Sequence, residues 1–421
     1  MNKSNNEQAA FESLSRLGCE TPGFRSQHLT RRVLAIVPYA PNRIRIRTPQ
    51  VLRELIQYAE VDLVYLDDGA PLELPSGIRN VIAIPNASEV ARAFRVLLGI
   101  LRGRPITQEF YNSGRLRRVV ANLDLDSYDA IYVERLPVHR YLKHQRVIYD
   151  CQDCVSRLTR LMFNHGKGYK RLLYGLDSLL LPRHERAACN AASVVVLSSH
   201  RDVADLRQLG VTTPIEVWTQ VHGDDVPPRI PCERDRFVIS FHGKLSYAAN
   251  ELALRVLGEL IAPALDPSRY ELRIIGRCPA RFHKKFGNLK FTGFVPSIMH
   301  EIRKSDLSVF PVEVSTGFPN KAMESLAVGV PFIATQRVVD ALYPRPDILE
   351  AGIYVRDITE FASTIEQYTR LSLSERQEIS RRCSEYARKV RNLPSRQGQW
   401  KRILGSSFVV PDSSLAEVAS E

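Results

Sequence analysis

The sequence predicts an α/β protein of two domains, each built on a parallel sheet. Short β-branched runs alternate with helical patterns, as in βαβ units. The alternation stops in a proline-containing stretch, residues 206–236, and then starts again, so this stretch is the predicted linker. The length of 421 residues exceeds one ordinary core and suits two domains of roughly 150 to 200 residues each.

Six strands are expected in the first half. Each is a short apolar run, which is typical of a parallel strand that is buried on both faces. They are residues 32–37, 61–66, 81–84, 129–133, 146–150 and 193–198, with helices over 50–59 and 89–102. These strands and helices predict a first α/β domain over residues 30–225.

The second half repeats this pattern. Its expected strands are residues 237–241, 270–275, 289–292, 307–310 and 331–335, with helices beginning near Asn250 and Asn320. This second domain is predicted to cover residues 226–380. A helix within 381–405 is expected to pack back on the first domain, and residues 1–29 and 406–421 are expected to be disordered. Two such domains leave a cleft between them, where small-molecule sites preferentially lie.

Composition and charge restrict the class of protein. Hydrophobic residues make up 44% and charged residues 25%, as in soluble globular proteins. The sequence contains no run of about 18 apolar residues, which is the length that a membrane-spanning helix needs. Residues 1–27 contain no apolar segment of the kind that a secretion signal needs, so we expect a cytoplasmic protein.

A formal net charge of +12 favours anionic partners. These could be phosphorylated ligands, anionic lipid headgroups or nucleic acid. Nucleic acid is the least supported, because the aromatic residues are not interleaved with the basic ones as stacking platforms would be. We therefore expect no nucleic-acid partner, and a peripheral contact with an anionic membrane, at the inner face of the cytoplasmic membrane.

The cysteines do not indicate a disulfide framework or a metal site. There are seven, an odd number, and the CxxC pair Cys151 and Cys154 has no second pair at zinc-like spacing. Two reduced thiols near a strand end are the expected outcome. No metal or other cofactor is predicted.

One strand-loop-helix segment carries the predicted chemistry. Gly317 lets the backbone approach a ligand closely, and free amides at the following helix start favour a phosphate. Lys321 falls in the first helical turn, and Glu324 lies at i+3 on the same side. A carboxylate there can accept hydrogen bonds from both hydroxyls of a ribose, so the segment suits a nucleoside diphosphate. The alternative is an ordinary solvated helix face.

The same segment resembles a known family. Residues 320–331, Asn-Lys-Ala-Met-Glu-Ser-Leu-Ala-Val-Gly-Val-Pro, are similar to the donor-site signature of family 4 glycosyltransferases, and the likeness is closest to bacterial exopolysaccharide-type members. Residues 241–250, 274–279 and 291–295 resemble the ends of the first three strands of that family's C-terminal domain. Weaker similarity covers residues 31–390.

The resemblance implies a GT-B fold, in which two Rossmann-like domains face each other across a cleft. It implies a retaining, metal-independent transferase that moves a sugar from a nucleotide-diphosphate sugar to a glycan, lipid-linked or small-molecule acceptor in polysaccharide or glycoconjugate biosynthesis. Lys321 would hold the diphosphate and Glu324 the ribose. Lys244 would be the second cation, with Arg277 as its substitute. The full donor-binding set comprises Gly243, Asn250, Gly276, Arg277, Gly293, Thr316, Gly317, Phe318 and Asn320, with the amides of Gly317 and Phe318 meeting the sugar.

The sequence departs from the family pattern at three places. Thr316 stands where many members have a glutamate that touches the donor sugar, which weakens the choice of sugar more than the activity. Pro319 removes one amide from the loop. Residues 218–221, Trp-Thr-Gln-Val, lack the glycine of the family's interdomain turn.

The acceptor side is predicted from arginines in the first half. Arg43, Arg45 and Arg47 follow the first strand, and Arg135 follows a later one. They could meet a phosphorylated or lipid-linked acceptor or the donor diphosphate. For the first three, the alternative is a solvated basic loop.

Three histidines, His139, His184 and His242, are interpreted as structural or surface residues, although His242 lies beside the predicted donor loop.

Three alternatives to a transferase remain open. One is a GT-B epimerase or phosphorylase, although no cofactor lysine or phosphate pocket for a phosphorylase is identifiable. Another is a catalytically inactive homologue that serves in assembly or binding. The third is a nucleic-acid-binding protein, which rests on the charge of +12 alone.

Overall fold

A computed structural model gives the fold of most of the chain. It describes residues 31–42, 45, 47–166, 168–220, 226–314, 316–342, 352–392 and 398–405. The two ends that the sequence predicts to be disordered, residues 1–29 and 406–421, lie outside these ranges.

The first half is a parallel sheet of seven described strands. They are β1 (Arg32–Val37), β2 (Glu60–Asp67), β3 (Ile78–Pro85), β4 (Ala130–Glu134), β5 (Val147–Gln152), β6 (Val194–Leu197) and β7 (Ile215–Val217). Their order in the sheet is β3-β2-β1-β4-β5-β6-β7, and every pair is parallel. The chain order therefore reverses between β1 and β4, as in doubly wound nucleotide-binding folds.

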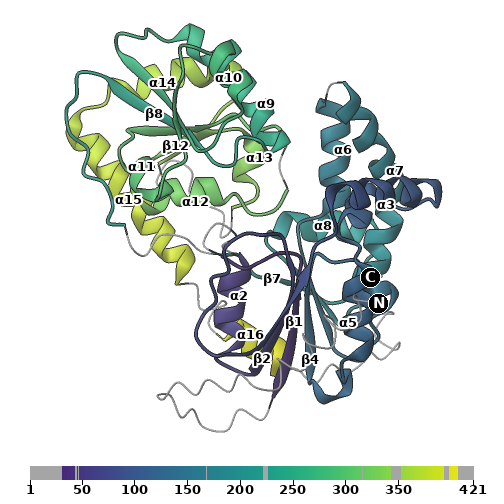
Figure 1. Cartoon of the computed structure of the whole chain (residues 1–421). Coiled ribbons are helices and arrows are strands. Elements are labelled where there is room, and N and C mark those ends of the chain that lie inside the picture. Colours follow the sequence, from purple (N-terminus) through teal and green to yellow (C-terminus); the bar gives the residue numbers. More distant parts are fainter. Residues whose placement is uncertain are drawn as a thin grey trace, which may run out of the picture. The chain divides into compact units, whose positions relative to one another are not determined.

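Helices connect these strands (Figure 1). They are α2 (Arg47–Leu55), α3 (Glu89–Leu101), α4 (Ile106–Tyr111), α5 (Gly114–Asn122), α6 (Val155–His165), α7 (Tyr169–Asn190) and α8 (His200–Gln208). Side chains of β1 alternate between two cores. Val33 and Ala35 pack with α2, whereas Leu34 and Ile36 pack with α5. Burial on both faces explains why these strands read as unbroken apolar runs.

The second half is a parallel sheet of six described strands. They are β8 (Phe237–His242), β9 (Tyr270–Ile275), β10 (Lys290–Gly293), β11 (Leu307–Phe310), β12 (Phe332–Ala334) and β13 (Ile353–Val355). The order is β10-β9-β8-β11-β12-β13, again all parallel, with the reversal between β8 and β11. The sequence predicted five of these strands, and the two parallel α/β sheets confirm the predicted fold class.

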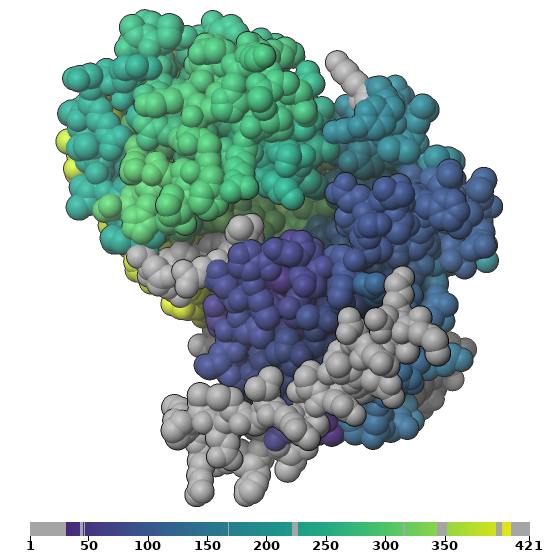
Figure 2. All heavy atoms as spheres, viewed as in Figure 1, coloured from purple at the N-terminus to yellow at the C-terminus, as the bar shows by residue number. Residues whose placement is uncertain are grey.

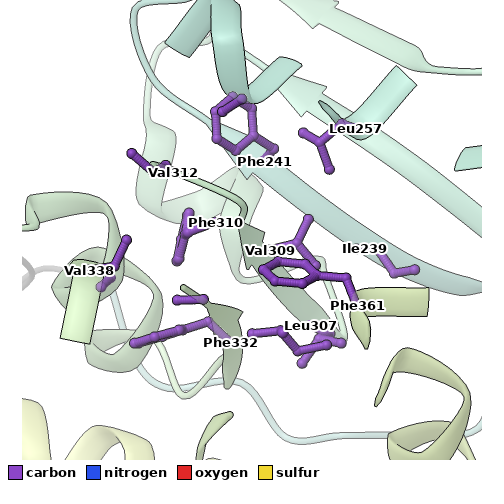
Figure 3. Close-up of a cluster of buried hydrophobic side chains, with 14 of the residues drawn as sticks. Ile239, Phe241, Leu257, Leu307, Val309, Phe310, Val312, Phe332, Val338 and Phe361 are labelled. Carbon is purple, nitrogen blue, oxygen red and sulfur yellow. The ribbon is translucent and has the colours of Figure 1, made fainter. Parts of the chain in front are cut away.

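The helices of this half complete its layers. They are α9 (Ala248–Val256), α10 (Ala280–Lys285), α11 (Ile298–Ile302), α12 (Asn320–Ala327), α13 (Gln336–Val339), α14 (Phe361–Thr369) and α15 (Leu373–Arg391). The core centres on aromatic and branched side chains of the central strands. Figure 3 shows Phe241 of β8, Phe310 of β11 and Phe332 of β12 within it. All three are fully buried, so the strands that carry the candidate site stand on a closely packed base.

The predicted linker is partly wrong. Helix α8 continues to Gln208, and β7 pairs with β6 as the last strand of the first sheet. Trp218 follows β7 and is buried in the first core. A three-residue strand between prolines gives too short a pattern to detect from sequence.

The chain returns to the first sheet at its C-terminal end. Helix α15 packs in the second core through Cys383, Ala387 and Val390. Helix α16 (Gln399–Gly405) packs in the first core through Trp400 and Ile403. Among the described helices, none is both long enough and apolar enough to cross a membrane.

Cys151 and Cys154 are free cysteines, as the sequence predicts. Both are buried, Cys151 on β5 and Cys154 just before α6. Burial raises the pKa of the Cys154 thiol, and so does the nearby Glu185 carboxylate.

Candidate functional site

The predicted donor residues gather where the second sheet reverses its strand order. Strands β8 and β11 are neighbours at this point. Ligands of open α/β sheets bind beyond the carboxyl ends of the strands at such a point. Hydrogen-bonded serines hold the elements in place: Ser308 of β11 contacts Ser240 of β8 at 3.0 Å and Ser325 of α12 at 2.9 Å.

Three glycines close the ends of β8, β9 and β10 and lie against one another. The amide of Gly276 donates to the carbonyl of Gly293 at 3.1 Å, and a Cβ on Gly276 would lie only 2.3 Å from the Gly243 carbonyl oxygen. Gly243 and Gly276 have φ of 130° and 124°, in the region that favours glycine. Side chains are thus excluded from this edge, which leaves bare backbone facing the candidate site.

Lys321 lies beside this glycine edge. A Cβ on Gly243 would come within 2.9 Å of the Lys321 Cε. The Lys321 ammonium donates to Asn250 Oδ1 and lies 4.6 Å from the centre of the Phe241 ring. Burial lowers the pKa of Lys321 to about 7, and the Glu324 carboxylate partly opposes this. The lysine is therefore a desolvated amine whose charged form an anionic ligand would stabilise.

Glu324 lies one turn further along α12 and is held by a histidine. Its Oε2 is 2.9 Å from His242 Nε2, and His242 is fully buried at the end of β8. Glu324 itself retains 9% exposure. The spacing that the sequence predicted on one helix face is confirmed, since Lys321 and Glu324 both face the end of β8. The contact with His242 was missed.

The loop before α12 makes contacts that the sequence did not predict. The Gly317 amide donates to Asp202 Oδ2 at 2.7 Å, and the Phe318 amide donates to Ser198 Oγ at 3.1 Å. Both acceptors come from the β6–α8 segment of the first half. The amides that the resemblance assigns to the donor are therefore satisfied by side chains in this structure. Burial, together with the charge of Asp153, raises the pKa of Asp202 to about 7.

The other donor-side residues lie around this loop. Thr316 and Asn320 are partly buried on either side of Gly317, and Asn250 lies on α9, where its amide also donates to the Lys244 carbonyl. Within the described ranges, the buried Asn320 Oδ1 has no hydrogen-bond partner. Lys244 and Arg277 both have exposed side chains, and Arg277 stacks on Phe294. Neither cation is locked into the fold.

The structure separates the four arginines of the predicted acceptor side. Arg43 lies outside the described residues. Arg45 pairs with Asp68 and stacks on the Tyr39 ring.

The expectation for Arg47 is wrong, because Arg47 is neither on a solvated loop nor open to a ligand. It begins α2, is buried, and makes two 2.8 Å bonds to Asp150 and one of 2.9 Å to the Trp218 carbonyl.

Arg135 is the arginine that faces a cavity. It directly follows β4 with φ 54°, and it lines a cavity of about 310 Å³ together with residues of α4 and α7. Among the described residues, no carboxylate lies within the 4 Å of an ion pair with Arg135. Its guanidinium donates to Gln152 Oε1 at 3.5 Å.

The other two histidines are structural. His139 is partly buried, and burial lowers its pKa to about 4. His184 bridges Arg140 and the Gly103 carbonyl.

Part of the second half matches a known protein family. Residues 236–370, which include the glycine edge, Lys321 and Glu324, match the family model described as glycosyl transferases group 1. This segment is a group 1 glycosyltransferase domain. No curated protein matches the chain in sequence.

Solved structures show the same fold. HepE of Anabaena in complex with UDP and glucose superposes with a TM-score of 0.59 at 14% identity, covering 89% of this chain and 99% of that one. WaaG, a glycosyltransferase of lipopolysaccharide biosynthesis, gives 0.58 at 12% identity, covering 88% and 99%. The N-terminal domain of the Candida albicans trehalose-6-phosphate phosphatase gives 0.56 at 14% identity, covering 92% and 99%. The fold is GT-B. Fold and family model together class the protein as a glycosyltransferase.

Proposed function

We propose that the protein is a retaining, metal-independent glycosyltransferase of family 4. It would transfer a sugar from a nucleotide-diphosphate sugar to a glycan, lipid-linked or small-molecule acceptor in polysaccharide or glycoconjugate assembly. The observation that carries the proposal is the convergence of the glycine edge, Lys321 and Glu324 at the β8/β11 reversal.

The chemistry needs positive charge where the nucleotide leaves. As the bond to the sugar breaks, negative charge grows on the departing diphosphate, and fixed cations and amides that face it lower the barrier. Lys321 is half-buried beside backbone without side chains, so a diphosphate can approach it closely. The exposed Lys244 can swing onto the same phosphates from the end of β8.

Glu324 is suited to the ribose. The contact between its Oε2 and His242 Nε2 fixes the orientation of the carboxylate, and therefore also the position of its other oxygen, Oε1. A fixed carboxylate one helical turn from the diphosphate cation reproduces the separation of ribose and phosphate in a nucleotide. The amides of Gly317 and Phe318 would then exchange Asp202 and Ser198 for oxygens of the donor.

The donor panel should begin with UDP-sugars, because HepE was solved with UDP and glucose. Thermal shift with UDP-, GDP-, ADP- and CMP-sugars should raise the melting temperature for one nucleotide class. The shift should disappear in Glu324→Ala and persist in Glu385→Ala, which removes an exposed carboxylate on α15. Absence of a shift with every nucleotide would overturn the proposal. A shift without sugar transfer or donor hydrolysis would favour the inactive homologue.

We propose that the protein meets its acceptor at a membrane. The net charge of +12 supports peripheral contact with an anionic surface, where lipid-linked acceptors reside.

A further inference from the structure

Exposed apolar side chains concentrate on three helices of the first half. Of the fifteen large apolar residues that are exposed in the described chain, four lie on α3, one on α4 and five on α7. On α3 they are Val90, Phe94, Leu97 and Leu101, which are 55 to 80% exposed. Figure 2 shows that residues of α3 lie on the surface. Scattered apolar residues need no explanation, but a concentration of this kind marks an interaction site.

The spacing places these residues on one face of each helix. On α3 the steps are four, three and four residues, which return to the same side of a helix. On α7 the exposed residues run from Tyr169 to Leu179 at steps of three, one, three and three. The helices meet through α4: Glu109 of α4 packs on Gly99 of α3, and Asp177 of α7 accepts from two amides at the start of α4. We call the exposed faces of these three helices the amphipathic surface.

The charge around this surface is basic. Arg92, Arg95, Arg102 and Arg104 lie on or just after α3, where Glu89 is the exposed acidic residue. On α7, Lys170, Arg171 and Arg183 flank the apolar positions. The carboxylates of α4 and α7 are buried and capped within the fold, as Glu109 is by Arg140. Apolar stripes with basic rims fit the interface of an anionic bilayer.

The amphipathic surface continues into the Arg135 cavity. Phe110 of α4 lines the cavity and is 45% exposed, so the cavity wall reaches this surface. Leu181 of α7 lines it as well. Glu185, the carboxylate on its wall, is already bonded to the Val155 and Ser156 amides. The Arg135 guanidinium is therefore a cation within a mostly apolar wall that opens beside the amphipathic surface.

We infer that the amphipathic surface docks on an anionic phospholipid bilayer and holds the Arg135 cavity at the level of the lipid headgroups. The inference rests on the proposed function in one respect: it places the acceptor in the membrane, with the phosphate of the acceptor near Arg135. Leu and Phe side chains enter the headgroup region, while the arginines pair with lipid phosphates.

Vesicle flotation tests the inference. The full chain is mixed with vesicles of phosphatidylcholine alone or with added phosphatidylglycerol. The wild type should float with the anionic vesicles and lose binding as salt rises. A variant carrying Val90→Glu, Leu101→Glu, Leu172→Glu and Leu179→Glu should bind about tenfold more weakly or not at all. Leu260→Glu, at an apolar site in the second half that is 57% exposed, should bind like the wild type.

Two further readouts separate the possible outcomes. Arg135→Gln should lower the preference for phosphatidylglycerol about threefold while leaving residual vesicle binding. The nucleotide-induced thermal shift should be the same in the surface variant and the wild type, so a failed donor site and a failed membrane surface are distinguishable. Wild-type protein that does not float with anionic vesicles would overturn the inference. So would a surface variant that floats normally, or a wild-type dimer that the variant merely dissociates.

Discussion

His242 and Glu324 are joined by a 2.9 Å contact between Nε2 and Oε2, although 82 residues separate them in the chain. His242 ends β8 and Glu324 lies on α12, so the contact links the two sides of the strand reversal. His242 is fully buried, while Glu324 retains 9% exposure. We therefore propose that His242 positions the Glu324 carboxylate for the donor.

Removing His242 should weaken nucleotide binding without touching the nucleotide. In His242→Ala the Glu324 carboxylate loses its fixed partner, and we expect about a tenfold rise in Kd. His242→Gln keeps a side-chain donor and should recover most of the affinity. Calorimetric titration of the nucleotide, with the melting temperature measured in parallel, checks this. If both variants lower stability equally and leave Kd unchanged, the role is structural only.

Donor binding should take up a proton above neutral pH. Burial lowers the pKa of Lys321 to about 7, from an ordinary value of 10.5, so Lys321 is neutral in the free protein between these values. A bound diphosphate favours the ammonium form, so affinity should fall as pH rises above about 7, by up to about tenfold per pH unit. Titration calorimetry in two buffers with different ionisation enthalpies measures the proton uptake. Lys321→Arg should flatten the pH dependence, and a wild type without proton uptake would contradict the account.

The close approach of Gly276 to Gly243 predicts a severe effect of a single methyl group. Gly276→Ala would place a Cβ 2.3 Å from the Gly243 carbonyl oxygen at φ 124°. We expect a loss of about 2 to 3 kcal/mol of stability and of measurable nucleotide binding. Gly287→Ala is the matched control, because a Cβ there meets nothing within 4 Å. Chemical denaturation and nucleotide titration of both variants distinguish them, and equal behaviour would argue against a packed glycine edge.

Asp202 should compete with the donor for the Gly317 amide. Its carboxylate accepts that amide at 2.7 Å, and with a pKa raised to about 7 by burial it becomes mostly ionised only above neutral pH. Asp202→Ala should therefore tighten nucleotide-sugar binding about threefold to tenfold, more strongly above pH 7 than below it. Asp205→Ala, on the same helix, should leave binding unchanged. Weaker binding in Asp202→Ala would instead make Asp202 a donor ligand.

Arg45 and Arg47, two positions apart in the chain, should differ in their effect on stability. Arg47→Met leaves the buried Asp150 carboxylate unpaired, for which we expect a loss of about 3 to 5 kcal/mol. Arg45→Met breaks a pair with Asp68 in which both side chains are 26% exposed, and should cost about 1 kcal/mol or less. Urea unfolding gives both values. A small effect of Arg47→Met would mean that this arginine is not structural.

The strands and the donor helix were predictable because their signals are local. Apolar runs closed by Gly276, Gly293 or Pro311 indicated strand ends, and the i+3 spacing placed Lys321 and Glu324 on one face. Strands β7 and β13, of three residues each, were missed, whereas β12, which is equally short, was predicted from the apolar run after the donor helix. Helix α7 contains Pro182, which a sequence pattern treats as a break.

The rest of the site depends on contacts between distant parts of the chain. Arg47 lies 103 residues from Asp150, and nothing in its basic loop indicated a buried partner. His242 meets Glu324 only when the second sheet has formed, and Gly317 meets Asp202 only when both sheets have formed. The mixed, apolar and basic character of α3 and α7 is visible in the sequence, but which face is exposed is decided by packing.

A crystal structure of the protein with a bound nucleoside diphosphate tests the central claim most directly. The account predicts the ribose hydroxyls on the Glu324 carboxylate, with the diphosphate between Lys321 and the Gly243 edge and within reach of Lys244. It also predicts that the Gly317 amide has left Asp202. A nucleotide bound elsewhere, such as in the Arg135 cavity, with Lys321 still bonded to Asn250, would contradict it.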